Sequence, residues 1–254
     1  MSENVTSYPD LATTPRGVPI CESRHAGGNY CEHALFAALY WEKTHPGIIG
    51  QTVDGNPLIG FLHVPEEHDH PETANRHDDT LWVLGQMLNT LIRHVSKKAI
   101  TILLTGYGPF GDITNNPSGH LITSTDALER LTCSLLGTCG AMVTTVTEDG
   151  LLITESFERA EGSTVHLRLI THLLPVAPGA VNGSKHSLQY HLEADQPHGV
   201  ILMGIACKAA AYRVETCATQ ENFRENVGSC LTADGTPLVS RALVWALVPE
   251  SGSR

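Results

Sequence analysis

The sequence predicts an α/β fold in which one open sheet carries helices on both of its faces. Apolar runs of strand character alternate along the chain with segments of helical periodicity, which is the pattern of α/β proteins with a largely parallel sheet. No stretch is rich enough in Gly, Ser or Pro to act as a linker. With 254 residues, 41% of them hydrophobic, the chain is long enough to bury a sizeable core. We therefore expect a single domain that spans residues 1–254.

Four segments have the spacing of apolar residues that predicts a helix. They are residues 31–42, 80–95, 119–136 and 184–195. The second is the most regular, because Leu81, Leu84, Leu88, Leu91 and Val95 fall on one helical face. Asp79 or Thr80 is expected to cap its first turn.

Three continuous apolar runs are typical of strands buried on both faces, namely residues 58–64, 99–105 and 199–205. Residues 141–174 instead contain three strand-like runs, broken by Asp149-Gly150 and Glu161-Gly162, which predicts a hairpin-like addition to the sheet. Residues 1–18 are expected to form an irregular lead-in.

The net charge and the hydropathy of the chain bear on three questions: whether the protein binds nucleic acid, whether it enters a membrane, and in which compartment it resides. The chain carries 16 Lys and Arg against 27 Asp and Glu, a formal net charge of -11, which repels phosphate backbones, so no nucleic-acid partner is expected. No apolar run approaches the roughly 18–20 residues that cross a bilayer, so no membrane partner is expected either. The first residues lack the basic and apolar regions of a secretory signal peptide, which predicts a cytoplasmic location.

Cysteine and histidine residues raise two hypotheses about chemistry. The seven cysteines contain no Cys-x-x-Cys pair, so we expect free thiols, one of which can be a nucleophile. Carboxylates and imidazoles gather in the polar stretch 66–79, at Glu66, Glu67, His68, Asp69, His70 and His77. This cluster can hold a divalent ion, but a solvated polar loop is the favoured interpretation, and neither a metal nor another cofactor is expected.

A glycine pattern follows the strand expected at 99–105. Gly106, Gly108 and Gly111 satisfy G-x-G-x-x-G, which in dinucleotide-binding folds brings a pyrophosphate to a helix N-terminus. Here Pro109 removes an amide donor and Asn116-Pro117 delays the helix, so nucleotide binding is the weaker interpretation.

The whole stretch 103–118, LLTGYGPFGDITNNPS, resembles the opening strand and turn of the pyroglutamyl peptidases. The signature of that family is TGF-x-PFG, four residues, then NP. Seven positions match, namely Thr105, Gly106, Pro109, Phe110, Gly111, Asn116 and Pro117, whereas Tyr107 replaces the usual Phe.

Three further motifs resemble the family in a rotated order. Residues 17–33 resemble its nucleophile segment and place the cysteine at Cys31, and GFLHVP at 60–65 places the histidine at His63. Glu215 lies eleven residues after Gly204, as the family's glutamate motif requires. The resemblance therefore implies a circularly permuted pyroglutamyl-peptidase-like fold, in which a Cys/His half at 18–95 precedes a half at 99–254 that holds the first-strand turn and the glutamate.

The resemblance implies roles for these residues. Cys31 would be the nucleophile, His63 the general base and acid, and Glu215 the group that orients His63. Tyr107, Phe110 and Asn116 would contact the substrate, the first two as an aromatic platform. The residues support this independently, because Cys31 is expected at a helix N-terminus, where backbone amides stabilise a thiolate or an oxyanion.

The surroundings of these residues depart from the family. Its arginine after the glutamate-motif strand would fall at Lys208-Ala209, and its arginine and asparagine after the glutamate are Thr216 and Gln220. Glu32 replaces the asparagine that follows the nucleophile.

We therefore expect a cysteine amidohydrolase that removes N-terminal pyroglutamate from a blocked peptide or a small molecule. One alternative is a specialised thiol-dependent amidase, acyltransferase or cyclase that acts on a small lactam-like or amino-acid-derived metabolite. Another is a non-catalytic binding module. The resemblance also leaves a homo-oligomer open, because family members often form dimers or tetramers.

Overall fold

The computed structural model of the protein describes twelve stretches of the chain, which are residues 10–24, 30–65, 76–95, 97–136, 143–147, 150–158, 162, 164–177, 180–181, 185–206, 209–218 and 238–240. All six residues expected to form the site lie within them. Residues 66–75 of the polar stretch and the position of Gln220 lie outside them.

Nine strands form one mixed sheet. In sheet order they are β1 (Asp10–Thr13), β2 (Pro19–Ser23), β9 (Tyr212–Glu215), β3 (Ile59–Pro65), β8 (Gly199–Ala206), β4 (Ala99–Tyr107), β7 (Thr164–Leu174), β6 (Leu151–Glu158) and β5 (Val143–Val146). The central strands β3, β8, β4 and β7 run parallel to one another, whereas β5, β6 and β7 form an antiparallel meander. The hairpin-like addition is thus confirmed, but the sheet is mixed and not largely parallel.

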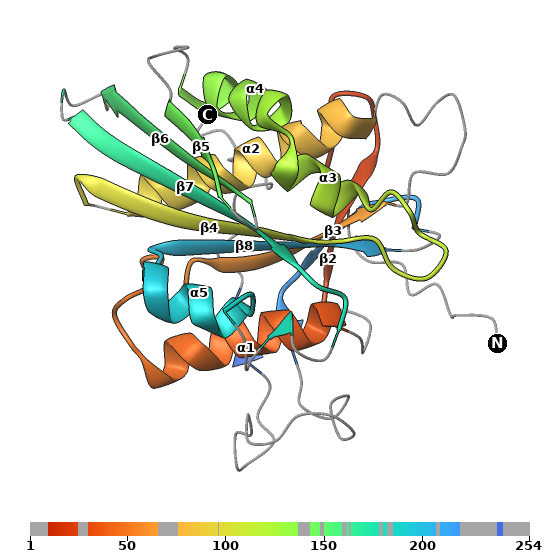
Figure 1. Ribbon diagram of the computed structural model, residues 1–254, viewed down its shortest axis with the longest axis horizontal. Coiled ribbons are helices and arrows are strands. Elements are labelled where there is room, and N and C mark those ends of the chain that lie inside the picture. Colours follow the sequence, from red (N-terminus) through yellow and green to blue (C-terminus); the bar gives the residue numbers. More distant parts are fainter. Residues whose placement is uncertain are drawn as a thin grey trace, which may run out of the picture.

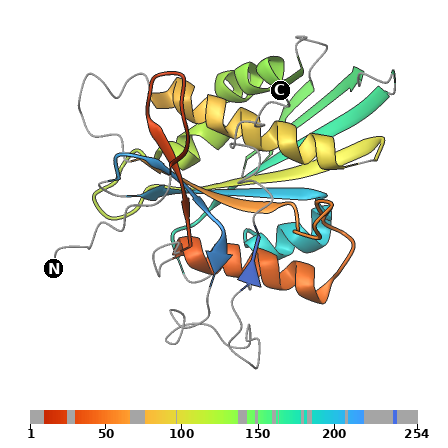
Figure 2. The ribbon, with the colours of Figure 1, turned by 180° about the vertical axis from the view of Figure 1, so that it is seen from behind.

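Helices cover both faces of this sheet, as predicted (Figure 1). On one face lie α1 (Tyr30–Thr44) and α5 (Leu188–Asp195), and on the other α2 (Arg76–His94), α3 (Pro117–Thr123) and α4 (Thr125–Leu136). The view from behind shows the same two layers (Figure 2). Because both faces are covered, β3 is buried along its whole length and β8 and β4 along most of theirs, which explains their continuous apolar runs.

Several boundaries differ from the expectation. The second helix begins at Arg76 and not at residue 80, so Asp79 and Thr80 lie inside its first turns and do not cap it. The expected helix 119–136 is two helices, because Ser124 takes an extended conformation (φ -89°, ψ 110°) that ends α3. Residues 10–13 are a strand, β1, which pairs antiparallel with β2, so the lead-in is not irregular throughout.

A glycine in β4 and another in α3 let this helix pack directly on the strand. A Cβ at Gly106 would overlap the backbone of Ser118, and one at Gly119 would overlap the backbone of Tyr107. The helix begins at Pro117 and not at Gly111, with Asn116 as its N-cap. Of the three glycines in the pattern, Gly106 therefore serves helix packing, whereas a Cβ at Gly108 or Gly111 would meet no atom within 4 Å. The late start of the helix disfavours the nucleotide interpretation.

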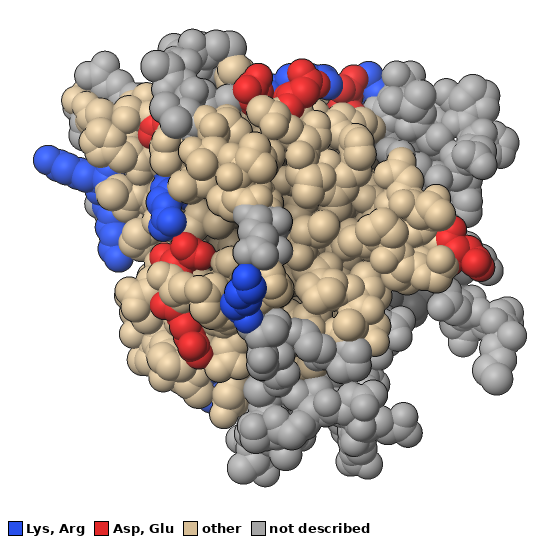
Figure 3. All heavy atoms as spheres, viewed as in Figure 1, with Lys and Arg blue, Asp and Glu red and all other residues tan. Residues whose placement is uncertain are grey.

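Two general findings concern the helices and the charged side chains. No helix in the described stretches is both long and apolar enough to span a membrane. On the face drawn in Figure 3, the described acidic and basic side chains lie in small separate groups, without an extended basic surface.

Candidate active site

Cys31 is the second residue of α1. It therefore lies at the N-terminus of the helix, where the first backbone N–H groups have no acceptor within the helix. Its Sγ rests against β8, because a Cβ added to Gly204 would lie 2.6 Å from Cys31 Sγ and 2.9 Å from Phe61 Cζ. Only a glycine leaves room for the sulfur at this point. The residue as a whole is partly exposed.

His63 lies beside the same glycine. In the parallel pairing of β3 with β8, His63 is directly opposite Gly204. The sulfur that packs on Gly204 therefore lies next to the imidazole, with which it shares a hydrogen bond. The ring is almost completely buried and is tilted against the ring of Phe61, with 4.8 Å between centroids.

Glu215 is the last residue of β9 and completes the arrangement. Because β9 runs antiparallel to β3 and pairs Glu215 with Phe61, the carboxylate is on the same sheet face as His63, two residues further along. Nδ1 of His63 lies 2.8 Å from Oε1 of Glu215, whose side chain is fully buried. A carboxylate only accepts, so Nδ1 carries the proton and Nε2 is left to face the thiol.

These contacts decide the charge state of the imidazole. Burial lowers the pKa of His63, but the charge and hydrogen bond of Cys31 and those of Glu215 outweigh it and raise the pKa to about 9. At neutral pH the ring is therefore protonated and is held by a buried carboxylate. A protonated imidazole next to the sulfur is the partner that stabilises the anionic form of a thiol nucleophile.

The other oxygen of the carboxylate, Oε2 of Glu215, is buried and has no hydrogen-bond partner among the residues that the structure describes. The next residue, Thr216, fastens the end of β9 to β2. Its backbone N–H donates to the carbonyl of Ser23 at 2.8 Å, and its hydroxyl donates to the same carbonyl at 3.1 Å. Thr216 thus supports the position of Glu215, a role that its place in the sequence did not reveal.

The three expected substrate contacts lie at the end of β4 and in the turn after it. Tyr107 is only 3% exposed, and its hydroxyl donates to the carbonyl of Tyr30 at 2.9 Å. Asn116 donates through Nδ2 to the carbonyl of Gly108 at 3.2 Å, while Oδ1 accepts from the amide and the hydroxyl of Ser118. Both side chains therefore have internal partners, and their contact with a substrate stays a prediction.

Phe110 is half-buried in the turn between β4 and α3. Its backbone exchanges two hydrogen bonds with Ile113, at 3.0 and 2.9 Å, which closes the turn. The structure thus brings Cys31, His63 and Glu215 together and places Tyr107 against the start of α1. Phe110 and Asn116 belong to the turn beyond β4.

Glu32, which replaces the family's asparagine, is buried and acts on a different thiol. Burial and then the charge of Glu32 raise the pKa of Cys217, while Arg24 opposes them. Among the other cysteines, Cys21 is buried and Cys133 partly buried. The expected positions of Cys139, Cys207 and Cys230 lie outside the described residues.

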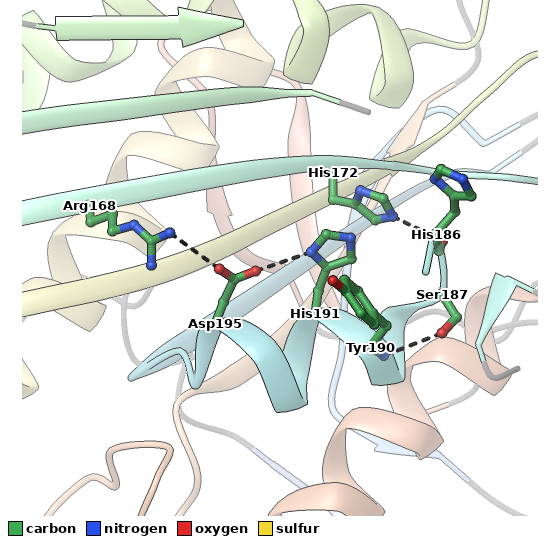
Figure 4. Close-up of polar contacts among 7 residues, drawn as sticks. All are labelled: Arg168, His172, His186, Ser187, Tyr190, His191 and Asp195. Carbon is green, nitrogen blue, oxygen red and sulfur yellow. Dashed lines mark hydrogen bonds and ion pairs between the residues drawn. The ribbon is translucent and has the colours of Figure 1, made fainter. Parts of the chain in front are cut away.

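A second polar cluster, which the sequence did not indicate, joins α5 to β7 (Figure 4). The rings of His172 and His191 are in contact, with centroids 3.7 Å apart and planes tilted by 38°, and Nδ1 of His191 lies 3.1 Å from Oδ2 of Asp195. Arg168 donates to the other oxygen of Asp195 at 3.3 Å. Burial raises the pKa of Asp195, but His191 and Arg168 outweigh it and lower the pKa. These contacts attach α5 to the sheet.

A metal site is not visible in the described stretches, where no three His, Cys, Asp or Glu side chains are arranged to hold an ion. Most of the expected metal cluster at 66–77 lies outside those stretches. No protein-family model, no curated protein and no solved structure matches the chain.

Proposed function

We propose that the protein is a cysteine amidohydrolase that cleaves an N-terminal pyroglutamyl amide through an acyl-thioenzyme. The observation that carries the proposal is the hydrogen bond of 2.8 Å between His63 and buried Glu215, beside the sulfur of Cys31 on Gly204. The three side chains come from three separate segments of the chain. Their convergence on a partly exposed cysteine at a helix N-terminus supports nucleophilic catalysis.

The first half-reaction forms the acyl-enzyme. The Cys31 thiolate attacks the carbonyl carbon of the scissile amide, and the carbonyl oxygen takes up the negative charge near the first amides of α1. When the tetrahedral intermediate collapses, the C–N bond breaks and the His63 imidazolium protonates the departing amine. Glu215 holds the ring through Nδ1 during this transfer.

The second half-reaction releases the acid. Neutral His63 takes a proton from a water molecule, which attacks the thioester carbonyl. The C–S bond then breaks and restores the Cys31 thiolate beside the protonated imidazole. Free pyroglutamate leaves, and no other reactant is required.

Two features of the fold support a circularly permuted pyroglutamyl-peptidase-like arrangement. The chain passes from the end of α2 at His94 to the start of β4 at Ala99 in a short connection, as expected where the family's termini are joined. The strands β2 and β9, which belong to the two sequence halves, are paired in parallel within the sheet. The Cys/His half and the Glu half therefore adjoin at the candidate site.

A second candidate is a specialised thiol-dependent amidase, acyltransferase or cyclase that acts on a different small acyl group. The observation that favours it is the internal hydrogen bonding of Tyr107 and Asn116, whose polar atoms are already used by Tyr30, Gly108 and Ser118. An altered pocket beside an intact Cys–His–Glu set fits a changed acyl group.

The experiment is release of a fluorescent amine from its pyroglutamyl amide and from a panel of other lactam and amino-acyl amides. Wild type is compared with Cys31→Ala and with Cys133→Ala, a control on α4 at the other face of the sheet. We expect turnover of the pyroglutamyl amide in wild type and in the control, and none in Cys31→Ala.

Iodoacetamide labelling of the same proteins separates the alternatives. Turnover of another panel amide only, or no turnover with Cys31 alkylated faster than Cys133, would favour the second candidate. A Cys31 that reacts no faster than Cys133, without turnover of any amide, would overturn the catalytic proposal and leave the binding module.

A further inference from the structure

The hydroxyl of Tyr107 makes a contact that a phenylalanine cannot make. Tyr107 is the last residue of β4, and its Oη donates to the backbone carbonyl of Tyr30 at 2.9 Å. The bond links positions 77 residues apart. With only 3% of the residue exposed, the ring offers almost no surface to a substrate, so its main contacts are internal.

The carbonyl that accepts this hydrogen bond belongs to the residue next to Cys31. Tyr30 is the first residue of α1 and immediately precedes the thiol. The donor stands on a central strand that is paired on both sides, with β7 and with β8. The bond therefore ties the start of α1, where the first backbone amides have no partner within the helix, to a strand inside the sheet.

The sulfur of Cys31 has little room to move. Its Sγ lies so close to Gly204 that an added Cβ would be 2.6 Å away, and it must also reach His63, which is opposite Gly204 in the neighbouring strand. A small shift of the first turn of α1 would lift the sulfur from the glycine and lengthen its hydrogen bond to the imidazole.

We propose that Tyr107 is a positioning residue for the nucleophile: through the carbonyl of Tyr30 it holds the first turn of α1 so that the Cys31 sulfur stays between Gly204 and His63. The inference rests on the proposed role of Cys31 as nucleophile. It differs from the expectation that Tyr107 is an aromatic platform for the substrate.

The phenol remains a hydrogen-bond donor while the thiolate is present. Burial and then the negative charge of Cys31 raise the pKa of Tyr107. The tyrosine therefore keeps its proton under the conditions in which the thiolate reacts, and the link to Tyr30 persists through the reaction.

The test is the rate at which iodoacetamide alkylates Cys31 in Tyr107→Phe, measured by mass spectrometry over a range of pH. The matched control is Tyr212→Phe, because Tyr212 is also buried and its hydroxyl also has a partner at 2.9 Å, Thr80. Tyr212 points to the opposite face of β9 from Glu215, three residues before it, and so away from the thiol. Thermal unfolding of both variants measures the loss of stability that they share.

We expect alkylation of Cys31 in Tyr107→Phe to be about two- to tenfold slower than in wild type near neutral pH. The difference should shrink above about pH 10, where a thiol ionises without help from His63. Tyr212→Phe should lose comparable stability and keep the wild-type rate of alkylation.

Two results would overturn the inference without touching the proposed function. One is an alkylation rate of Cys31 in Tyr107→Phe that equals the wild-type rate at every pH. The other is an equally slow alkylation in Tyr107→Phe and Tyr212→Phe, which would indicate a general effect of lost stability. A wild-type Cys31 that iodoacetamide does not modify faster than Cys133, in a protein that turns over no amide, would instead overturn the proposed function and this inference together.

Discussion

Replacement of Glu215 by Gln tests the His63–Glu215 pair directly. The substitution keeps the size of the side chain and an acceptor for Nδ1–H, but removes a buried negative charge 2.8 Å from the ring. In the wild type, burial lowers the pKa of His63, whereas Cys31 and Glu215 raise it from 6.5 to about 9. Without the charge of Glu215, we expect that pKa to fall back toward 6.5.

The change in pKa translates into a pH dependence of stability. A rise from 6.5 to about 9 on folding corresponds to about 3 kcal/mol of stabilisation shared between Cys31 and Glu215. Because the pKa is raised in the folded state, this stabilisation is fully present below pH 6.5 and is lost as the pH rises through about 9. Glu215→Gln should therefore flatten the curve of unfolding free energy against pH over this window.

The assay is urea unfolding at a series of pH values, for wild type, Glu215→Gln and Glu129→Gln. Glu129 is exposed on α4, so its replacement makes the same change of net charge without touching the site. We expect the control to follow the wild-type slope and the Glu215 variant to lose a clear part of it. A Glu215→Gln curve parallel to that of the wild type would refute the assignment of Glu215 as the partner that holds charge on His63.

Three further substitutions test other parts of the site. Gly204→Ala should slow alkylation of Cys31 by about tenfold or more and lower the unfolding free energy by about 1–3 kcal/mol, because the added Cβ would displace the sulfur. In the control Gly108→Ala the added Cβ would meet no atom within 4 Å, so neither the rate of alkylation nor the unfolding free energy should change. Thr216→Val removes the hydroxyl that contacts the carbonyl of Ser23 and the carboxylate of Glu22, and should lower the unfolding free energy by about 1 kcal/mol in urea titrations. No change would mean that the hydroxyl adds nothing to the backbone pairing of β9 with β2. Asn116→Ala should cost about 1 kcal/mol through loss of the α3 cap, while Asn116→Asp should keep most of it, and equal losses in the two would contradict the capping role.

The central strands could be predicted from the sequence because both of their faces are covered. The apolar runs at 58–64, 99–105 and 199–205 became β3, β4 and β8 within two residues at each end. The strand β9 was not predicted, since Tyr212–Glu215 is four residues long and has no distinctive pattern. Its position between β2 and β3 depends on pairings that join distant parts of the chain.

The same limit applies to the candidate site. Motif spacing singled out Cys31, His63 and Glu215, but the contact of His63 with Glu215 bridges 152 residues and depends on the antiparallel pairing of β3 with β9. The bond from Tyr107 to Tyr30 ends on a backbone carbonyl, which carries no signature in the sequence. Side-chain identity predicted which groups take part, whereas strand order decided which of them meet.

The position of β9 has a consequence for how the protein is made. The strands β2 and β3 are consecutive along the chain, yet β9 lies between them in the sheet. During synthesis their facing edges stay unpaired until residues 212–215 leave the ribosome, and an open edge is a template for pairing with other chains. Closing this gap joins segments that are distant in sequence, so it is entropically expensive and slow. His63 thus acquires its carboxylate partner, Glu215, among the last steps of folding, and we expect a truncated product that lacks β9 to be prone to aggregate.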